Sequence, residues 1–233
     1  MNPAKYLPAV QSIVNTPGCI PRHYPRPMKA LRSAFRVDVV QKRAVLPLPP
    51  LDLTRSDTDY VVALDLWADG EFDHHVALLY LANTDTVHWV DSRGLPVARD
   101  VGLYARTSRR LGMRQLYAAL ERHVRAACAK NKLRFSPQAT VSRRFRPPQD
   151  VEFGALGPKS DRDAYTRVPG KCFLWLQIML DGMMKHRWTP LQWHRWFYSK
   201  PSRRKPAGAR AFIHGRVRAI SRDCATSLTK PSS

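Results

Sequence analysis

The sequence predicts one α+β domain in the middle of the chain, flanked by two basic ends. Three observations predict this fold class. Three short apolar segments, separated by turn residues, lie between residues 60 and 91. A long segment with apolar residues at helical spacing follows at 108–130, and a further segment at 168–180 is apolar on all sides. Runs of strands followed by runs of helices are typical of α+β proteins.

The strands are expected at 60–67, 75–81 and 86–91. These segments are rich in apolar and β-branched side chains, and the second is apolar enough to be buried on both faces. Turn residues at 68–71 and 82–85 separate them. Because each turn is short, we expect hairpins and therefore a small antiparallel sheet.

Three helices are expected after the strands. The segment 108–130 carries a single apolar stripe with arginines outside it, which predicts an amphipathic helix. The segment 168–180 has no polar face and therefore predicts a central buried helix. The third helix begins with Thr189 as N-cap and Pro190 as first residue, and three aromatic side chains are expected on its inner face: Trp193, Trp196 and Phe197.

Charge divides the chain into three parts. The 39 Lys and Arg residues outnumber the 18 Asp and Glu residues and give a net charge of +21. Residues 1–50 hold nine of the 19 prolines with eight basic residues and one acidic residue, which predicts an extended basic arm. Residues 199–233 hold nine basic residues and one acidic residue and predict a solvated tail with one short ordered piece around 211–220. The balanced middle, 51–198, is the expected folded domain.

The four cysteines lie far apart and form no CxxC pair. A disulfide framework is therefore not expected, and a reducing compartment fits better. The first residues lack the pattern of a signal peptide, and no apolar stretch is long enough to span a membrane. His186 and His194 have no partners at zinc-ligand spacing. We therefore expect an intracellular, soluble protein with no membrane contact, no metal and no other cofactor.

Cys172 is the candidate nucleophile. It follows Pro169-Gly170 at the start of the expected buried helix. The amide groups at a helix N-terminus favour an anion, so a thiol there ionises more readily and becomes a better nucleophile. The alternative is that Cys172 is a small core residue, which is common for free cysteines.

His75 and Asp91 are the candidate base and orienting acid. His75 begins the second strand, and Asp91 ends the third strand, 16 residues later. In a tight hairpin the start of one strand faces the end of the other, so the two side chains are expected to meet. His74 competes for this role, but neighbouring strand residues point to opposite faces, so only one of the two histidines can face Asp91.

These motifs resemble a superfamily of papain-like cysteine proteases that includes the SUMO-specific proteases and the adenovirus protease. The resemblance covers scattered motifs between about residues 60 and 190. It rests on His75 followed by an apolar strand, on the Trp89-Val90-Asp91-Ser92 turn, and on Gly170-Lys171-Cys172-Phe173-Leu174-Trp175. The last motif is similar to the GxCxxW form of members from large DNA viruses. The resemblance implies a papain-like fold and a cysteine endopeptidase or isopeptidase.

Two features depart from the family pattern. Phe173 follows the nucleophile where the family usually has Gly, and no Gln stands at the usual short distance before it. The family uses that Gln amide to bind the oxyanion. Two candidates remain: Lys159, in Gly157-Pro158-Lys159, and Gln149.

The expected partners follow from both arguments. The resemblance implies protein substrates, with viral capsid or core precursors as the leading class, in the cytoplasm or nucleus of a host cell or in the virion. The charge favours nucleic acid bound through the basic ends. The alternative is a protease-fold structural protein that is weakly active or inactive and binds nucleic acid. Six residues of the tail are the candidate phosphate contacts: Arg203, Arg204, Lys205, Arg210, Arg216 and Arg218.

Overall fold

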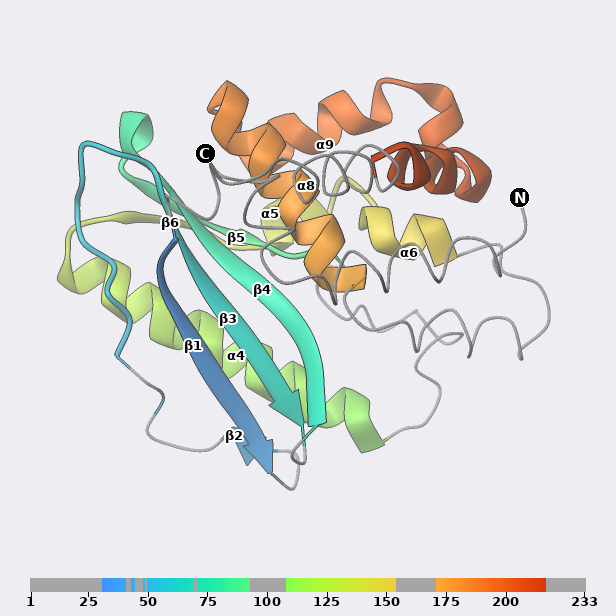
Figure 1. Cartoon of the computed structure of the whole chain (residues 1–233). Helices are drawn as coiled ribbons and strands as arrows, with labels where there is room; N and C mark the ends of the chain where they lie inside the picture. Colours follow the sequence, from blue (N-terminus) through green and yellow to red (C-terminus); the bar gives the residue numbers. More distant parts are fainter. Residues whose placement is uncertain are drawn as a thin grey trace, which may run out of the picture.

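A mixed six-stranded sheet forms the centre of the domain, in the order β2-β1-β3-β4-β5-β6 (Figure 1). The structure is a computed structural model that describes residues 31–40, 43–44, 48, 50–68, 71–92, 108–153 and 171–216. The strands are β1 (Leu31–Val40), β2 (Arg43–Ala44), β3 (Tyr60–Ala68), β4 (Glu71–Leu81), β5 (Thr86–Val90) and β6 (Arg134–Ser136). The predicted hairpins β3–β4 and β4–β5 are antiparallel. The α+β class is thus confirmed.

The sheet is larger than expected and not purely antiparallel. Strand β1 pairs with β3 in parallel, and β6 pairs with β5 in parallel. Strand β1 lies within the predicted extended arm, 1–50. Its ten residues contain no proline, because the prolines of the arm stand before and after it. The arm therefore contributes to the sheet, and the domain begins before residue 51.

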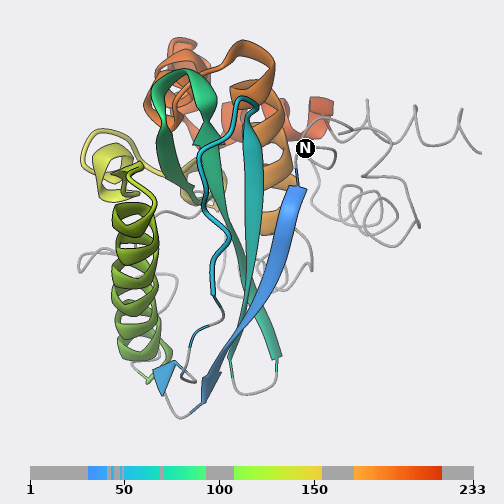
Figure 2. The same cartoon turned by 90° about the vertical axis from the view of Figure 1, so that its left-hand side faces the viewer.

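The helices sit on both faces of the sheet (Figure 2). Helix α4 (Ser108–Lys130) covers one face and has the predicted bounds. Helix α8 (Lys171–His186) covers the other face and extends six residues beyond the predicted end at 180. The remaining helical segments are η1 (Ala82–Thr84), α5 (Ala139–Ser142), α6 (Pro148–Phe153), α9 (Pro190–Tyr198), η2 (Pro201–Arg204) and a helix at 206–216.

Two apolar clusters form, one on each face of the sheet. Strand alternation distributes β4 between them, since Leu79 belongs to the α8 side and its neighbour Leu78 to the α4 side. The α8 side contains Leu174, Trp175 and Met179 of α8. The all-apolar surface of this helix is therefore explained by burial between the sheet and α9.

Helix α9 begins as predicted. The Thr189 side chain accepts a hydrogen bond from the Gln192 backbone, and the Gln192 side chain accepts one from the Thr189 backbone, so that a full capping box is present. Trp193 and Phe197 are buried, but Trp196, expected on the same inner face, is 40% exposed. Gly182 of α8 permits the close approach of α9, since a Cβ there would lie 2.8 Å from Trp193 Nε1.

The expected solvated tail is partly folded. Residues 206–216 form a helix whose Ala209 and Ile213 are fully buried in the α8-side cluster. The apolar spacing of these two residues, one turn apart, explains the packing. The folded domain therefore continues beyond residue 198. The part of the tail after residue 216 lies outside the described residues.

Two buried histidines should make the fold sensitive to mild acid. Burial lowers the pKa of His88 to about 4, helped by the nearby Arg134 guanidinium, and burial lowers the pKa of His194 to about 4 as well. An unfolded histidine titrates near 6.5. Between these values the unfolded chain binds more protons, so stability should be full above pH 6.5 and decline as pH falls towards 4, by on the order of 1 kcal/mol per pH unit for each histidine.

His88→Leu tests this expectation. Neither ring nitrogen of His88 has a hydrogen-bond partner among the residues that the structure describes. Urea unfolding at pH 7, 6 and 5 should therefore show a shallower loss of stability in His88→Leu than in the wild type. His186→Leu is the matched control, because His186 is exposed. Equal slopes for His88→Leu and wild type would contradict the expectation.

Candidate active site at the head of helix α8

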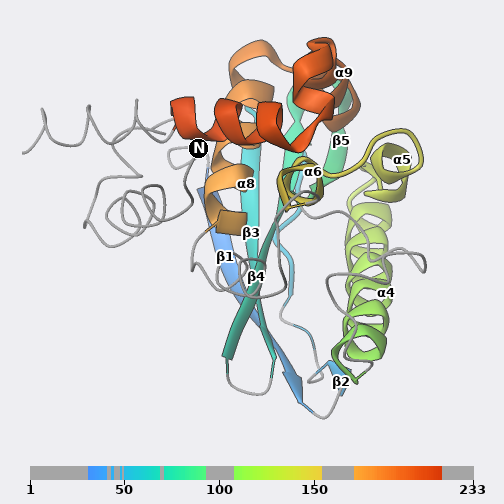
Figure 3. The ribbon, with the colours of Figure 1, turned by 90° about the vertical axis from the view of Figure 1, so that its right-hand side faces the viewer.

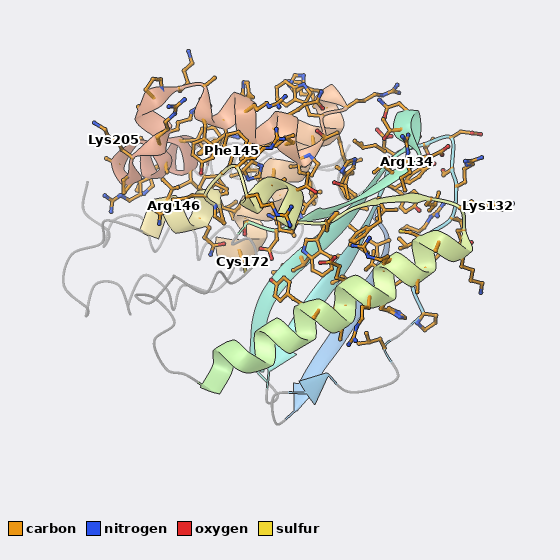
Figure 4. All side chains as sticks on the ribbon, turned by 180° about the vertical axis from the view of Figure 1, so that it is seen from behind. Lys132, Arg134, Phe145, Arg146, Cys172 and Lys205 are labelled. Carbon is orange, nitrogen blue, oxygen red and sulfur yellow. The ribbon has the colours of Figure 1, made fainter. Side chains whose placement is uncertain are left out.

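Cys172 lies in the first turn of α8 and is 6% exposed. The first amide groups of a helix have no partner within the helix, so they favour a negative charge at this end. Cys128, in α4, is the other cysteine within the described residues, and burial raises the pKa of its thiol to about 11. At neutral pH Cys128 therefore remains a thiol. Cys19 and Cys224 lie outside the described residues. Figure 4 shows Cys172 on α8.

Ser92 connects Gln149 to the backbone of Cys172. The Ser92 hydroxyl donates to Gln149 Oε1 over 2.7 Å and also lies 3.4 Å from the carbonyl oxygen of Cys172. The Gln149 backbone amide donates in turn to the Ser92 carbonyl over 3.3 Å. Ser92 and Gln149 are both buried. Three segments that are distant in the sequence thus meet at the head of α8, and Gln149 is brought close to the candidate nucleophile.

Glu152 and Trp175 hold α6 against α8. The indole Nε1 of Trp175 donates to Glu152 Oε2 over 2.7 Å, and both residues are fully buried. Gln149 and Glu152 are on the same short helix, α6, while Trp175 lies three residues after Cys172. This bond therefore fixes the position of Gln149 relative to Cys172. It also gives a structural reason for the tryptophan of the GxCxxW pattern.

Asp91 is fully buried and is held from the α4 side. Its Oδ2 accepts a 2.5 Å hydrogen bond from the Tyr117 hydroxyl, and its backbone carbonyl lies 3.5 Å from Gln138 Nε2. Tyr117 belongs to the α4-side cluster, next to Trp89. A buried carboxylate with a charge-assisted hydrogen bond has a fixed orientation, which suits a residue that orients a base.

The hairpin register differs by one residue from the predicted pairing of His75 with Asp91. Leu81 pairs with Thr86 and Ala77 with Val90, so continuing the ladder sets position 75 opposite Ser92. Position 75 lies on the same face of the sheet as Ala77, the α8 side, because the two are two residues apart in one strand. The Asp91 side chain, in contrast, accepts a hydrogen bond from Tyr117 on the α4 side. Position 75 therefore lies on the face of the sheet that α8 covers, and its pairing with Asp91 stays a prediction.

Strand alternation puts position 74 on the α4 face of the sheet, the face to which Asp91 bonds. His74 pairs with Leu66 in β3, in unbroken register with the pair Leu64 and Val76. Both Leu64 and Val76 belong to the α4-side cluster. The reason is the period of two along a strand: a shift of one residue moves every position to the other face. Position 74 thus lies on the α4 face, opposite to the face on which α8 carries Cys172, and His75 remains the candidate base of Cys172.

The other predicted site residues have mixed outcomes. Lys159 and Arg218 lie outside the described residues. Arg203 is packed among rings, with its guanidinium carbon 4.9 Å from the ring centre of Trp196 and 4.7 Å from that of Phe212. It is therefore held as part of the fold, and burial lowers its pKa.

The remaining basic candidates are nearer to solvent. Arg204 is exposed and donates from Nε to the Tyr198 carbonyl over 3.1 Å, and Arg216 forms an ion pair of 3.5 Å with Asp181. Lys205 is exposed, and Arg210 is half-buried. The position of the tail residues on a folded surface was not foreseen from the sequence.

Sequence reasoning also missed Ser92, Tyr117 and Glu152 as residues that support the site. Only Ser92 had a signal, as the residue after Asp91 in the predicted turn. Within the described part of the chain, no three His, Cys, Asp or Glu residues are grouped as a metal site would require. None of the described helices is long and apolar enough to cross a membrane.

The chain matches no protein-family model, no curated protein and no solved structure.

Proposed function

We propose that the chain is a cysteine endopeptidase or isopeptidase with a papain-like fold. The observation that carries the proposal is the meeting of Asp91-Ser92, Gln149 and Cys172 at the head of one buried helix. A thiol at a helix N-terminus, a buried acid at the end of a hairpin and an amide beside the nucleophile are the parts that acyl transfer through a thioester needs.

Each residue has a role in the proposed reaction. The Cys172 thiolate attacks the substrate carbonyl carbon, and the oxygen takes up the negative charge. His75, oriented by Asp91, holds the thiol proton and gives it to the leaving amine as the carbon–nitrogen bond breaks. Gln149 and the Cys172 backbone amide stabilise the oxyanion. Water, deprotonated by the same histidine, then hydrolyses the thioester and restores the thiol.

The substrate class follows from the resemblance rather than from the geometry. The proteins that these motifs resemble include viral proteases that mature capsid or core precursors. We propose the same class of substrates here, with a large DNA virus as the source. The high positive charge is compatible with a protein packaged beside nucleic acid.

Selective alkylation tests the proposed nucleophile. Brief treatment of the native protein with a peptide vinyl sulfone at pH 7, followed by peptide mass spectrometry, should find label on Cys172 well before Cys128. The reason is that Cys128 is held as a thiol by its raised pKa. After unfolding in urea both cysteines should react. Labelling of Cys172 only after unfolding would contradict the proposed enzyme.

A second candidate function is favoured by the charge. Outside the site, the chain has basic residues in large excess, and the described part of the tail is a folded surface rather than a loose extension. A structural protein on this fold could bind nucleic acid without using Cys172. The alkylation test separates the two, because a purely structural protein has no reason to activate this thiol.

A further inference from the structure

The chain segment that forms one end of the domain contains no acidic residue. From residue 182 to residue 216 the sequence contains nine basic residues and no Asp or Glu. The loop 143–146 adds three arginines to the same end. We call this set the basic cap: Arg143, Arg144, Arg146, Lys185, Arg187, Arg195, Lys200, Arg203, Arg204, Lys205, Arg210 and Arg216. Arg216 is partly neutralised by Asp181.

The basic cap is a rigid surface. Helix α9 and the helix at 206–216 are anchored in the core by Phe197 and Ile213, which are fully buried. The loop 143–146 is fixed to α9 by the Tyr198 hydroxyl, which donates to the Arg146 carbonyl over 2.6 Å, and by Phe145, whose ring stacks on that of Tyr198. Figure 3 shows α9 and the following helix at the same end of the domain.

The cap lies away from the other basic residues that Figure 4 marks. Lys205, Phe145 and Arg146 gather at one end in that view, and Lys132 and Arg134 lie at the opposite end. The basic residues of the cap are thus a group separate from Lys132 and Arg134. A concentrated positive surface of this kind attracts a polyanion.

Trp196 lies within the cap and is the one large hydrophobic side chain exposed among the described residues, at 40%. Arg203 lies over its ring at 4.9 Å, and the Trp188 ring lies 5.6 Å away, itself stacked on His186 at 4.4 Å. Neighbouring rings and a guanidinium thus hold the indole in place. An ordered, exposed aromatic ring surrounded by cations is the arrangement that stacks on nucleic-acid bases.

Arg187 adds an independent observation. It ends α8 in the left-handed backbone region, with φ of 53°, and Trp188 N–H donates to the Met183 carbonyl over 2.8 Å to close the helix end. Glycine is favoured at such a position, because other residues are strained there. This helix end thus holds the exposed Arg187 directly before Trp188.

We propose that the basic cap binds single-stranded nucleic acid, with Trp196 as the stacking platform and the exposed Arg and Lys side chains of the cap as phosphate contacts. A single strand fits better than a duplex, since the bases of a duplex are stacked on one another and cannot lie on the indole. An acidic protein would bind to the positive charge of the cap but would not require the exposed indole ring of Trp196. The inference deepens the proposed contact with nucleic acid, and it does not require Cys172 to be active.

The test uses the full chain and a fluorescein-labelled oligothymidylate, with fluorescence anisotropy as the readout. Trp196→Ala should weaken binding by between about 5- and 150-fold, the loss expected for one stacked base. Binding to a duplex of the same length should change little. Arg187→Gly should also weaken binding and flatten the log–log salt dependence by about 0.7, the value for one phosphate contact on a single strand.

Lys132→Gly is the matched control for Arg187→Gly. Lys132 is also exposed, also has φ of 53°, and also follows a helix whose end is closed by a backbone bond, from Leu133 N–H to the Cys128 carbonyl. Both glycine variants remove one charge and relieve the same backbone conformation, so neither should lower the melting temperature. Only Arg187→Gly should weaken oligonucleotide binding.

Three results would overturn the inference. Equal weakening by Lys132→Gly and Arg187→Gly would mean that binding depends on net charge alone. If Trp196→Ala has no effect and the duplex binds as tightly as the single strand, the basic ends bind the nucleic acid and the cap is not a single-strand site. Competition by polyglutamate as effective as by unlabelled oligothymidylate would assign the cap to an acidic protein.

Discussion

Alanine at position 75 should slow the alkylation of Cys172 at pH 7 by two or more orders of magnitude, whereas alanine at position 74 should slow it far less. A general base typically contributes 10²–10⁴-fold, because it removes the thiol proton and stabilises the thiolate. The β4–β5 register puts position 75 on the face of the sheet that α8 covers, and Cys172 lies in the first turn of α8. The measurement is the pseudo-first-order rate of vinyl sulfone labelling, read by mass spectrometry.

His74→Ala is the matched control, since it removes the same side chain from the adjacent position of the same strand. Asp91→Asn should slow labelling as His75→Ala does, because the amide cannot stabilise an imidazolium as the carboxylate does. A slow His74→Ala protein beside an unaffected His75→Ala protein would show that the base is not selected by strand alternation.

Replacing Gln149 with alanine should lower kcat/KM for a peptide substrate by about 10²–10³-fold, the typical cost of removing one oxyanion donor. The Ser92 hydroxyl bonds Gln149 Oε1 and thereby leaves the amide NH2 group as the donor. Alkylation of Cys172 by a small electrophile should be largely retained, because this reaction builds no tetrahedral oxyanion. Turnover and labelling rate are therefore measured on the same preparation.

Gln177→Ala is the control for losing a buried glutamine. Gln177 lies on α8 and is 5% exposed, and its Oε1 has no hydrogen-bond partner within the described residues. This variant should keep its turnover. Ser92→Ala should fall between the two, because Gln149 remains but loses the bond that orients it. Unchanged turnover in Gln149→Ala would move the donor to Lys159 or to the backbone.

Local patterns predicted the central elements well. Helix α4 has the bounds that the apolar stripe at 108–130 predicts, and α9 has the N-cap that Thr189-Pro190 predicts. Both patterns depend only on residues that are neighbours in the sequence. Strand β1 was missed because it is stabilised by pairing with β3, a parallel partner that the chain reaches only through a long connection. Trp196 was assigned to the inner face of α9, yet the spacing alone does not show where the next helix leaves a side chain uncovered.

The segments that form the site were predicted, and the choice of His75 as base stays a prediction. The turn at 82–85 was recognised, and a four-residue turn that joins Leu81 to Thr86 already sets the register. Counting back along the ladder puts position 75 on the face of the sheet that α8 covers. The approach of Gln149 to Cys172 could not be predicted in this way, because it depends on α6 packing against α8 through Glu152 and Trp175.

Helix α8 is a rigid spacer with Cys172 in its first turn and Arg187 directly after its last. Its 16 residues correspond to a rod about 24 Å long. Two ligands can therefore occupy its ends at once without touching each other. A protein substrate already attached to the same nucleic-acid strand would be presented to Cys172 at a high effective concentration. Nucleic acid would then lower the apparent KM for such a tethered substrate and leave the turnover of a short free peptide unchanged.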